Sequence, residues 1–244
     1  MKHCKALDKK IGNKLSFDQV LLKQRRGLTQ SVATTFVNPF SYPIVGDDEP
    51  LLTALDHIYS DGALHTSLHN IFNTNQIERL SFDFSSVAHD VLQFAVENSL
   101  KVALVGAKPG LVEQAAKNYQ QMYPGLNIAY HHHGYLNEPG MEDGVIDELN
   151  TVSADIVICG MGTPRQEQFI LTLKQRLNNP ALLFTCGGFI EQSAIKADYY
   201  HPLVKRFGLR WVQRAIMHKH VRTRLMQDYP KFICNYIFSQ LKAK

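Results

Sequence analysis

Short apolar runs, each closed by a turn, are the feature of this chain that most constrains its fold. Four runs read as strands, and several segments between them space their apolar residues as helices do. Strands that alternate with helices predict an α/β protein with a Rossmann-like, mainly parallel sheet flanked by helices. The strand-like runs cover residues 31–37, 101–106, 155–161 and 181–187, and the helical patterns cover residues 84–98, 110–122, 142–152 and 164–178.

An asparagine and several glycines stand where the chain leaves these predicted strands. Asn38 follows the first run and Gly106 ends the second, while Gly160–Gly162 and Gly187–Gly188 close the third and fourth. In open parallel sheets, ligands bind beyond the carboxyl ends of the strands. We therefore expect these residues to border one crevice.

The segment Gly160–Glu167, with the sequence GMGTPRQE, is the strongest local signal for a binding site. It predicts the end of a strand, a glycine turn and a helix that opens at Pro164. Glycines let backbone N–H groups approach a ligand closely, and a helix N-terminus favours anions. Proline is also common at the first position of any helix. Local features thus leave a ligand site and an ordinary strand-to-helix connection equally open.

Composition indicates a folded protein with reduced thiols. Of the 244 residues, 45% are hydrophobic and 20% are charged, which is typical of globular chains and not of disordered ones. The four cysteines are scattered without CxxC or zinc-finger spacing, as expected in a cytosolic protein. No apolar run approaches the roughly 20 residues of a membrane span, and no apolar block of an export signal follows the basic N-terminus.

Basic charge is concentrated near the C-terminus. Residues 205–244 hold ten lysines and arginines and one acid, a net charge of +9, whereas residues 1–204 carry −5. Apolar residues interleave with these cations, and Pro230 is expected to break the helical segment in two. Such a segment is typical of a helix on an anionic membrane surface. A C-terminal helix pair with a solvated basic face and a nucleic-acid contact are the alternatives. We assign residues 1–202 to the α/β domain and residues 203–244 to a basic amphipathic appendage.

Two polar motifs are candidates for chemistry. Asp61-Gly62 follows the helix-like residues 51–59, and its carboxylate could be a general base, although aspartate before glycine is also plain turn chemistry. His131–His133 suggests a metal, but consecutive side chains on a strand alternate in direction and cannot all reach one ion. The turn at residues 105–110 lacks GxGxxG and the P-loop GK[ST]. We therefore expect no metal, no cofactor, and neither a dinucleotide oxidoreductase nor an NTPase.

Taken in order, these motifs resemble the signature of the WecG/TagA/CpsF glycosyltransferases, of the N-acetylmannosaminyl and N-acetylmannosaminuronyl type. That family transfers a sugar from a nucleotide donor to a membrane-bound, polyprenyl-diphosphate-linked sugar. Residues 160–167 resemble its G-x-G-x-P-K/R-Q-E segment, and the similarity runs from about Ser31 to Arg224. Further matches are LVGAKPG at 104–110, YPGL at 123–126, HGY at 133–135, GG at 187–188 and GLRW at 208–211.

The resemblance implies an inverting transfer from a UDP-linked sugar in surface-polysaccharide assembly. Asp61 matches the family's DG aspartate, which is implied to deprotonate the acceptor hydroxyl as it attacks the donor's anomeric carbon. Arg214 and Arg224 match arginines implied to bind the lipid diphosphate, which places the protein in the cytoplasm, peripheral on the inner face of the cell membrane. The residues implied to border donor and acceptor are Asn38, Arg79, Gly106, Gly134, Tyr135, Gly160, Gly162, Pro164, Gln166, Glu167, Gly187, Gly188 and Glu191.

The chain also departs from the family pattern near the implied pocket. Phe36 stands at a threonine position, Glu191 and Ile195 replace an aspartate and a glycine, and Arg210 replaces a glutamate. These departures leave open a catalytically divergent nucleotide-sugar-binding or assembly subunit of the same pathway. The acidic body argues against a nucleic-acid partner, and a homo-oligomer stays open.

Overall fold

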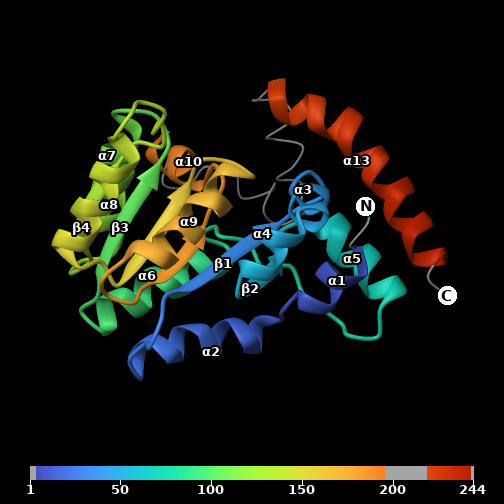
Figure 1. Cartoon of the computed structure of the whole chain (residues 1–244), viewed down its shortest axis with the longest axis horizontal. Coiled ribbons are helices and arrows are strands. Elements are labelled where there is room, and N and C mark those ends of the chain that lie inside the picture. The colour runs from blue at the N-terminus through green and yellow to red at the C-terminus, as the bar shows by residue number, and fades with distance from the viewer. Residues whose placement is uncertain (1–3, 196–218, 243–244) are drawn as a thin grey trace.

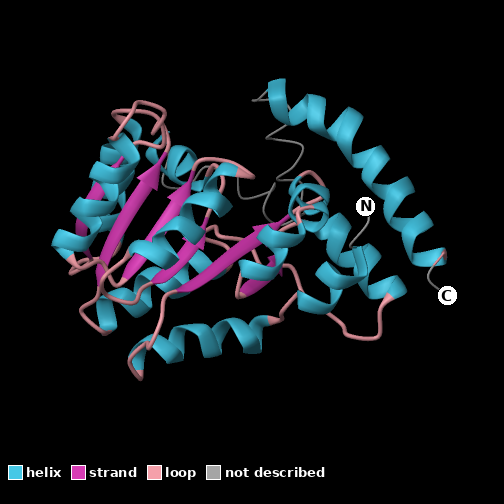
Figure 2. Ribbon diagram, viewed as in Figure 1, coloured by secondary structure: helices cyan, strands magenta, loops and turns pink. Residues whose placement is uncertain are grey.

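The computed structural model describes residues 4–195 and 219–242, whose strands form one six-stranded sheet. The strand order is β2-β1-β6-β5-β3-β4, and every pair of neighbours is parallel (Figures 1 and 2). The predicted α/β fold with a parallel sheet is therefore confirmed. The strands are β1 (Val32–Val37), β2 (His57–Ser60), β3 (Lys101–Gly106), β4 (Asn127–His132), β5 (Ile156–Gly160) and β6 (Leu182–Thr185).

Helices cover both faces of the sheet, and each face has its own apolar core. Neighbouring residues of a strand enter opposite cores: Leu104 belongs to one and Val105 to the other, as the pleat of a strand requires. One face is covered by α2 (Lys14–Arg25), α6 (Val87–Glu97), α7 (Leu111–Met122) and α10 (Phe189–Ile195). The other is covered by α1 (Cys4–Lys10), α3 (Ser41–Asp47), α4 (Glu49–Ala54), α5 (Ala63–Phe72), α8 (Met141–Val152), α9 (Arg165–Arg176) and α13 (Lys219–Leu241).

The segment before Asp61 was expected to be helical through residue 59, and this expectation was wrong. Helix α4 ends at Ala54, and the chain then enters strand β2, which pairs with β1. The apolar residues Ile58 and Tyr59 are fully buried because β2 is covered by helices on both faces. Asp61 therefore follows a strand, at the carboxyl end of the sheet where ligands bind.

The C-terminal helix does not break at Pro230, contrary to the sequence prediction. Helix α13 is continuous from Lys219 to Leu241 with Pro230 inside it, and it lies beside the N-terminal helix α1 (Figure 1). A proline inside a helix costs about 3 kcal/mol or more. Phe232 and Tyr236, two and six residues further on, are buried against the body, and each contributes roughly 1.5–3 kcal/mol. This packing offsets the loss at the proline.

Candidate active site

A cleft of about 1090 Å³ lies at the carboxyl ends of the strands. Its walls come from the segments that follow all six strands, which the parallel sheet brings to one edge. Tyr229, Pro230 and Ile233 of α13 also line it, so the C-terminal helix forms part of the wall. A crevice at the strand ends is thus present, and its volume suits a ligand larger than a single sugar.

Asp61 reaches the wall of this cleft because the turn after β2 is held against the end of β1. Its backbone N–H donates to the carbonyl of Val37 at 2.8 Å. The next residue must be glycine, because a Cβ on Gly62 would lie 2.8 Å from Cδ of Pro39. Helix α5 starts immediately afterwards at Ala63. At the DG pair, the ends of β1 and β2 therefore lie close together, and Asp61 presents its carboxylate to the cleft.

Arg79 connects two carboxylates on the same wall. Its Nη2 lies 3.2 Å from Oδ1 of Asp61 and 2.8 Å from Oδ2 of Asp83, and its Nε donates to the Asp61 carbonyl at 3.1 Å. The loop is fixed beside β2 because the N–H of Leu80 donates to the Ser60 carbonyl at 2.8 Å. The guanidinium holds the Asp61 carboxylate in one orientation.

Asp83 was missed by sequence reasoning, although it stands four residues after Arg79 and also lines the cleft. Burial raises the pKa of Asp83, but the charge of Arg79 and hydrogen bonds from Ser85 outweigh burial, so the pKa lies below its ordinary value. Asp83 is therefore a charged partner that keeps Arg79 in place. An arginine followed by an acid at i+4 is the signal that could have found it.

Gln166 ties two glycine turns together. Its Oε1 accepts from the N–H of Gly162 at 3.3 Å and from the N–H of Gly187 at 3.1 Å, while its Nε2 donates to Glu167 at 2.9 Å. These two glycine N–H groups thus bond to the protein itself. We expected the glycine turn to present N–H groups to a ligand, but the N–H of Gly162 bonds to Gln166 instead. Gln166 thus shapes the turn, and it lines the cleft itself.

Glu167 is fully buried behind the cleft and does not line it. Its Oε1 accepts from the hydroxyls of Thr35 at 2.9 Å and Thr163 at 3.0 Å. Thr35 in turn bonds to Thr185 at 2.8 Å, so the network joins β1, β6 and the start of α9. Glu167 therefore supports the wall from behind, whereas Phe36, the neighbour of Thr35, faces the cleft.

The glycines at the strand ends differ in position. Gly106 does not line the cleft: a Cβ there would lie 2.5 Å from the carbonyl oxygen of Gly160. A Cβ on Gly160 would lie 2.7 Å from the carbonyl oxygen of Gly187. The ends of β3, β5 and β6 can converge only because these positions lack side chains.

The other predicted residues divide into those on the wall and those beside it. Asn38 lines the cleft, but its Oδ1 accepts from the N–H groups of Phe40 and Ser41 at the start of α3. Pro164 precedes α9 without lining the cleft, so this helix begins one residue later than predicted. The remaining predicted residues on the wall are Gly134, Tyr135, Gly160, Gly162, Gly187, Gly188 and Glu191, and cleft residues not predicted there include Phe82, Asn137 and Phe189.

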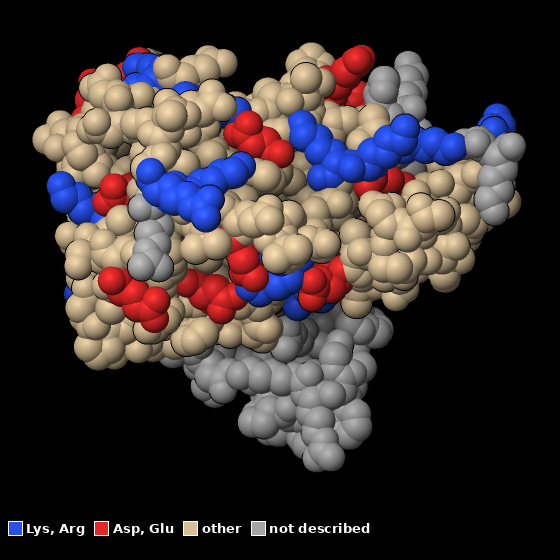
Figure 3. Space-filling view, turned by 90° about the horizontal axis from the view of Figure 1, so that it is seen from below, with Lys and Arg blue, Asp and Glu red and all other residues tan. Residues whose placement is uncertain are grey.

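Two predicted lipid-binding arginines cannot be placed. Arg214 and Arg210 lie outside the described residues. The expected boundary between the α/β domain and the appendage, at residue 203, lies outside them too. Arg224 is described only as part of the backbone of α13. On the face seen in Figure 3, basic and acidic side chains are interspersed over the described part of the chain rather than gathered into one basic surface.

The histidine run and the actual histidine cluster are different parts of the molecule. In the run, Nδ1 of His132 lies 2.8 Å from the carbonyl of its own neighbour His133. The group that could hold a metal among the described residues is Asp8, His65 and His69, which we call the Asp8 cluster. Sequence reasoning overlooked the spacing of four residues between His65 and His69, which places them on one helical face.

Comparison with known proteins identifies the family of this chain. The family model described as "Glycosyl transferase WecG/TagA/CpsF family" matches residues 13–244. A protein of Shigella boydii named UDP-Gal:alpha-D-GlcNAc-diphosphoundecaprenol beta-1,4-galactosyltransferase is 44% identical over 207 residues, 85% of this chain and 86% of that protein. An N-acetylglucosaminyldiphosphoundecaprenol N-acetyl-beta-D-mannosaminyltransferase of Staphylococcus aureus (strain MW2) is 32% identical over 129 residues, 52% of this chain and 49% of that protein. The chain therefore belongs to the WecG/TagA/CpsF glycosyltransferase family.

Proposed function

We propose that this enzyme transfers a hexose, with inversion, from a UDP-sugar to a polyprenyl-diphosphate-linked saccharide, and that Asp61 is the general base. The observation that carries the proposal is the position of Asp61, on the cleft wall at the strand ends and oriented by Arg79. The relative from Shigella boydii, similar along most of both chains, supports UDP-galactose as the donor and an N-acetylglucosaminyl diphosphate lipid as the acceptor.

The chemistry requires a base on one side of the anomeric carbon and stabilisation of the leaving group on the other. The acceptor hydroxyl oxygen forms the new bond to the anomeric carbon as Asp61 takes its proton. The bond to the UDP oxygen breaks, and the leaving diphosphate gains negative charge. Arg165, on the cleft wall at the first residue of α9, combines a guanidinium with a helix N-terminus, and both favour that charge. Because UDP-galactose is α-linked, a β-linked product requires inversion.

Asp61→Asn tests this assignment. Replacing a general base is expected to lower kcat by about 10²–10⁴-fold without unfolding the protein. Asp147→Asn is the matched control, because Asp147 is an exposed residue of α8 outside the cleft. UDP-galactose, UDP-glucose and UDP-N-acetylhexosamines are offered with an N-acetylglucosaminyl diphosphate lipid, and UDP release and product are measured.

Two results would overturn the proposal in different ways. An Asp61→Asn variant that retains most of the activity removes Asp61 from the role of base. A wild-type chain that binds UDP-sugars but transfers none of them identifies a nucleotide-sugar-binding subunit instead.

We further propose that residues 203–244 form an appendage through which α13 lies on the anionic inner face of the cell membrane. Met226, Phe238 and Leu241 expose 74%, 60% and 58% of their surface, which is unusual for large apolar side chains on one helix. The Lys242 ammonium lies 4.4 Å from the ring centroid of Phe238, so charge and apolar surface are adjacent. No helix within the described residues is long and apolar enough to span a bilayer.

Sedimentation with vesicles of phosphatidylglycerol and phosphatidylethanolamine tests the membrane surface. The double change Phe238→Ser and Leu241→Ser removes exposed apolar surface without opening the core, and it is expected to weaken vesicle binding at least about tenfold. Leu15→Ser on α2 is the control, because Leu15 is 67% exposed on a helix away from α13 (Figure 1). Equal binding of the double variant and the wild type would exclude this surface.

A further inference from the structure

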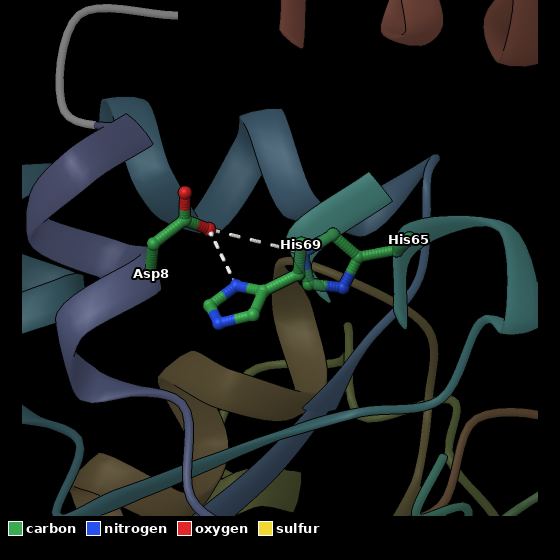
Figure 4. Close-up of side chains that lie close together, drawn as sticks. All are labelled: Asp8, His65 and His69. Carbon is green, nitrogen blue, oxygen red and sulfur yellow. Dashed lines mark ion pairs between the residues drawn. The ribbon is translucent and has the colours of Figure 1, made fainter. Parts of the chain in front are cut away.

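The Asp8 cluster brings three metal-ligating side chains together outside the cleft. Asp8 belongs to α1, and His65 and His69 belong to α5 (Figure 4). One ligand atom from each lies within 4.8 Å of the other two. Oδ1 of Asp8 is 3.4 Å from Nδ1 of His69 and 3.9 Å from Nε2 of His65. All three side chains are at most 2% exposed, so water does not dominate their interactions.

The outer nitrogens of both imidazoles are already held, which aims the inner nitrogens at Asp8. Nε2 of His69 lies 3.1 Å from the carbonyl oxygen of Asn75, and Nδ1 of His65 lies 2.8 Å from the hydroxyl of Ser60. A carbonyl oxygen only accepts, so Nε2 of His69 carries the hydrogen, and Nδ1 of a neutral His69 presents a lone pair to a carboxylate.

The two inner nitrogens have no hydrogen-bond partner in the described part of the chain. Two imidazole nitrogens and a carboxylate oxygen that converge in this way in a buried space are an arrangement that a cation between them would satisfy.

We propose that Asp8, His65 and His69 bind a divalent transition-metal ion of the zinc class. Two imidazoles and one carboxylate are the donors that zinc and its neighbours prefer, whereas Mg²⁺ and Ca²⁺ favour oxygen alone. Tetrahedral ligands about 2.1 Å from zinc stand about 3.4 Å apart, which matches the 3.4 Å between Asp8 and His69, whereas His65, at 3.9 Å, would have to move slightly closer. The hydrogen bonds to Ser60 and Asn75 are the outer contacts that metal-binding histidines usually make.

This ion would be structural, because none of its three ligands lines the cleft. His65 lies in the first turn of α5, which begins two residues after Asp61. The other oxygen of Asp8 accepts from Tyr236 at 2.9 Å and from Gln240 at 2.5 Å, both on α13. One ion would therefore restrain α1, the helix that follows Asp61, and the C-terminal helix together.

Metal titration of the untagged, full-length, chelator-treated chain tests the site. Calorimetry with Zn²⁺ is expected to show one ion per chain, and Co²⁺ is expected to give the visible absorption of a four-coordinate ion. His69→Gln is expected to weaken binding more than about 100-fold, because loss of even an outer partner costs 10–100-fold. His131→Gln, which changes an exposed histidine, is expected to bind as the wild type does. Zinc affinity that is the same in His69→Gln and wild type would refute the site.

A second measurement needs no variant and so does not depend on how the variants fold. X-ray absorption at the zinc edge of the loaded wild-type chain is expected to show two imidazole nitrogens and oxygen ligands without sulfur. Cysteine sulfur around zinc, or no bound zinc after gel filtration, would overturn the proposal. The absence of bound zinc would show that Asp8 pairs with the two histidines directly, without an ion between them.

Discussion

Removing the hydroxyl of Tyr236 tests whether α13 is held by a buried charge. Tyr236 is fully buried, and its hydroxyl donates to Oδ2 of Asp8 at 2.9 Å and accepts from Nδ2 of Asn73 at 3.2 Å. Burial raises the pKa of Asp8, but the nearby imidazoles of His65 and His69 and the hydroxyls of Tyr42 and Tyr236 outweigh it, so its pKa lies below the ordinary value and the carboxylate is charged. Phenylalanine retains the shape of the ring, and hence the change removes polar contacts and no apolar volume.

The magnitude follows from those contacts. A hydrogen bond to a charged group contributes about 1.5–3 kcal/mol, and a buried partner left without its bond costs a similar amount. Tyr42 at 2.6 Å and Gln240 at 2.5 Å still donate to Asp8, which places the expected loss near 2 kcal/mol. A change of this size raises the unfolding equilibrium constant about 30-fold and is a large share of the roughly 5–15 kcal/mol that stabilises a domain.

Urea unfolding followed by circular dichroism measures this loss, with EDTA present so that bound metal does not contribute. Tyr130→Phe on β4 is the control, because that side chain is only half-buried, and it is expected to change stability by less than about 0.5 kcal/mol. Hydrogen exchange in α13 should increase in Tyr236→Phe. If Tyr236→Phe is as stable as the control, the Asp8 contacts do not hold α13 to the body.

Two further predictions concern the cleft. Gln166→Leu removes the acceptor shared by the N–H groups of Gly162 and Gly187. We expect kcat/KM for sugar transfer to fall at least about tenfold, because small displacements of the residues that position a substrate cost orders of magnitude in rate. Unchanged kinetics would show that the two turns hold their shape without Gln166. Asp83 has a lowered pKa, so the stability that it contributes is present above its ordinary value of 3.8 and is lost as the pH falls further. The stability difference between wild type and Asp83→Asn in urea should therefore shrink from pH 6 to pH 3, and a difference independent of pH would contradict this role.

The strands that sequence reasoning found are the four inner ones, and the strands that it missed are the two edges. β1, β3, β5 and β6 each lie between two other strands, and their residues form nearly continuous apolar runs because helices bury both faces. β4 is half-exposed and carries polar residues, and β2 is only four residues long. The pattern of β4 therefore resembles that of a loop, whereas β2 is buried but too short for its pattern to be told from a helix.

The candidate site was predictable where a motif is local. The DG pair and the segment Gly160–Glu167 are each contiguous in the sequence, and both reach the cleft. The division of roles within the segment was not local: Gln166 bonds to Gly187 and Glu167 bonds to Thr35, at 21 and 132 residues of separation. Which residues face a ligand and which support the wall depends on those distant contacts.

Sequence alone determined the α/β class, the parallel sheet and the family, because these depend on short-range periodicity and on motifs whose spacing is kept along the chain. Tertiary structure decided the rest. It kept α13 continuous through Pro230, paired Arg79 with Asp83, and placed Asp8 against His65 and His69. Burial is the physical reason: a carboxylate or an imidazole has one energy in water and another inside a packed interior, and the burial of Phe232 and Tyr236 offsets the proline between α13's two halves. Only the fold assigns each side chain to its environment.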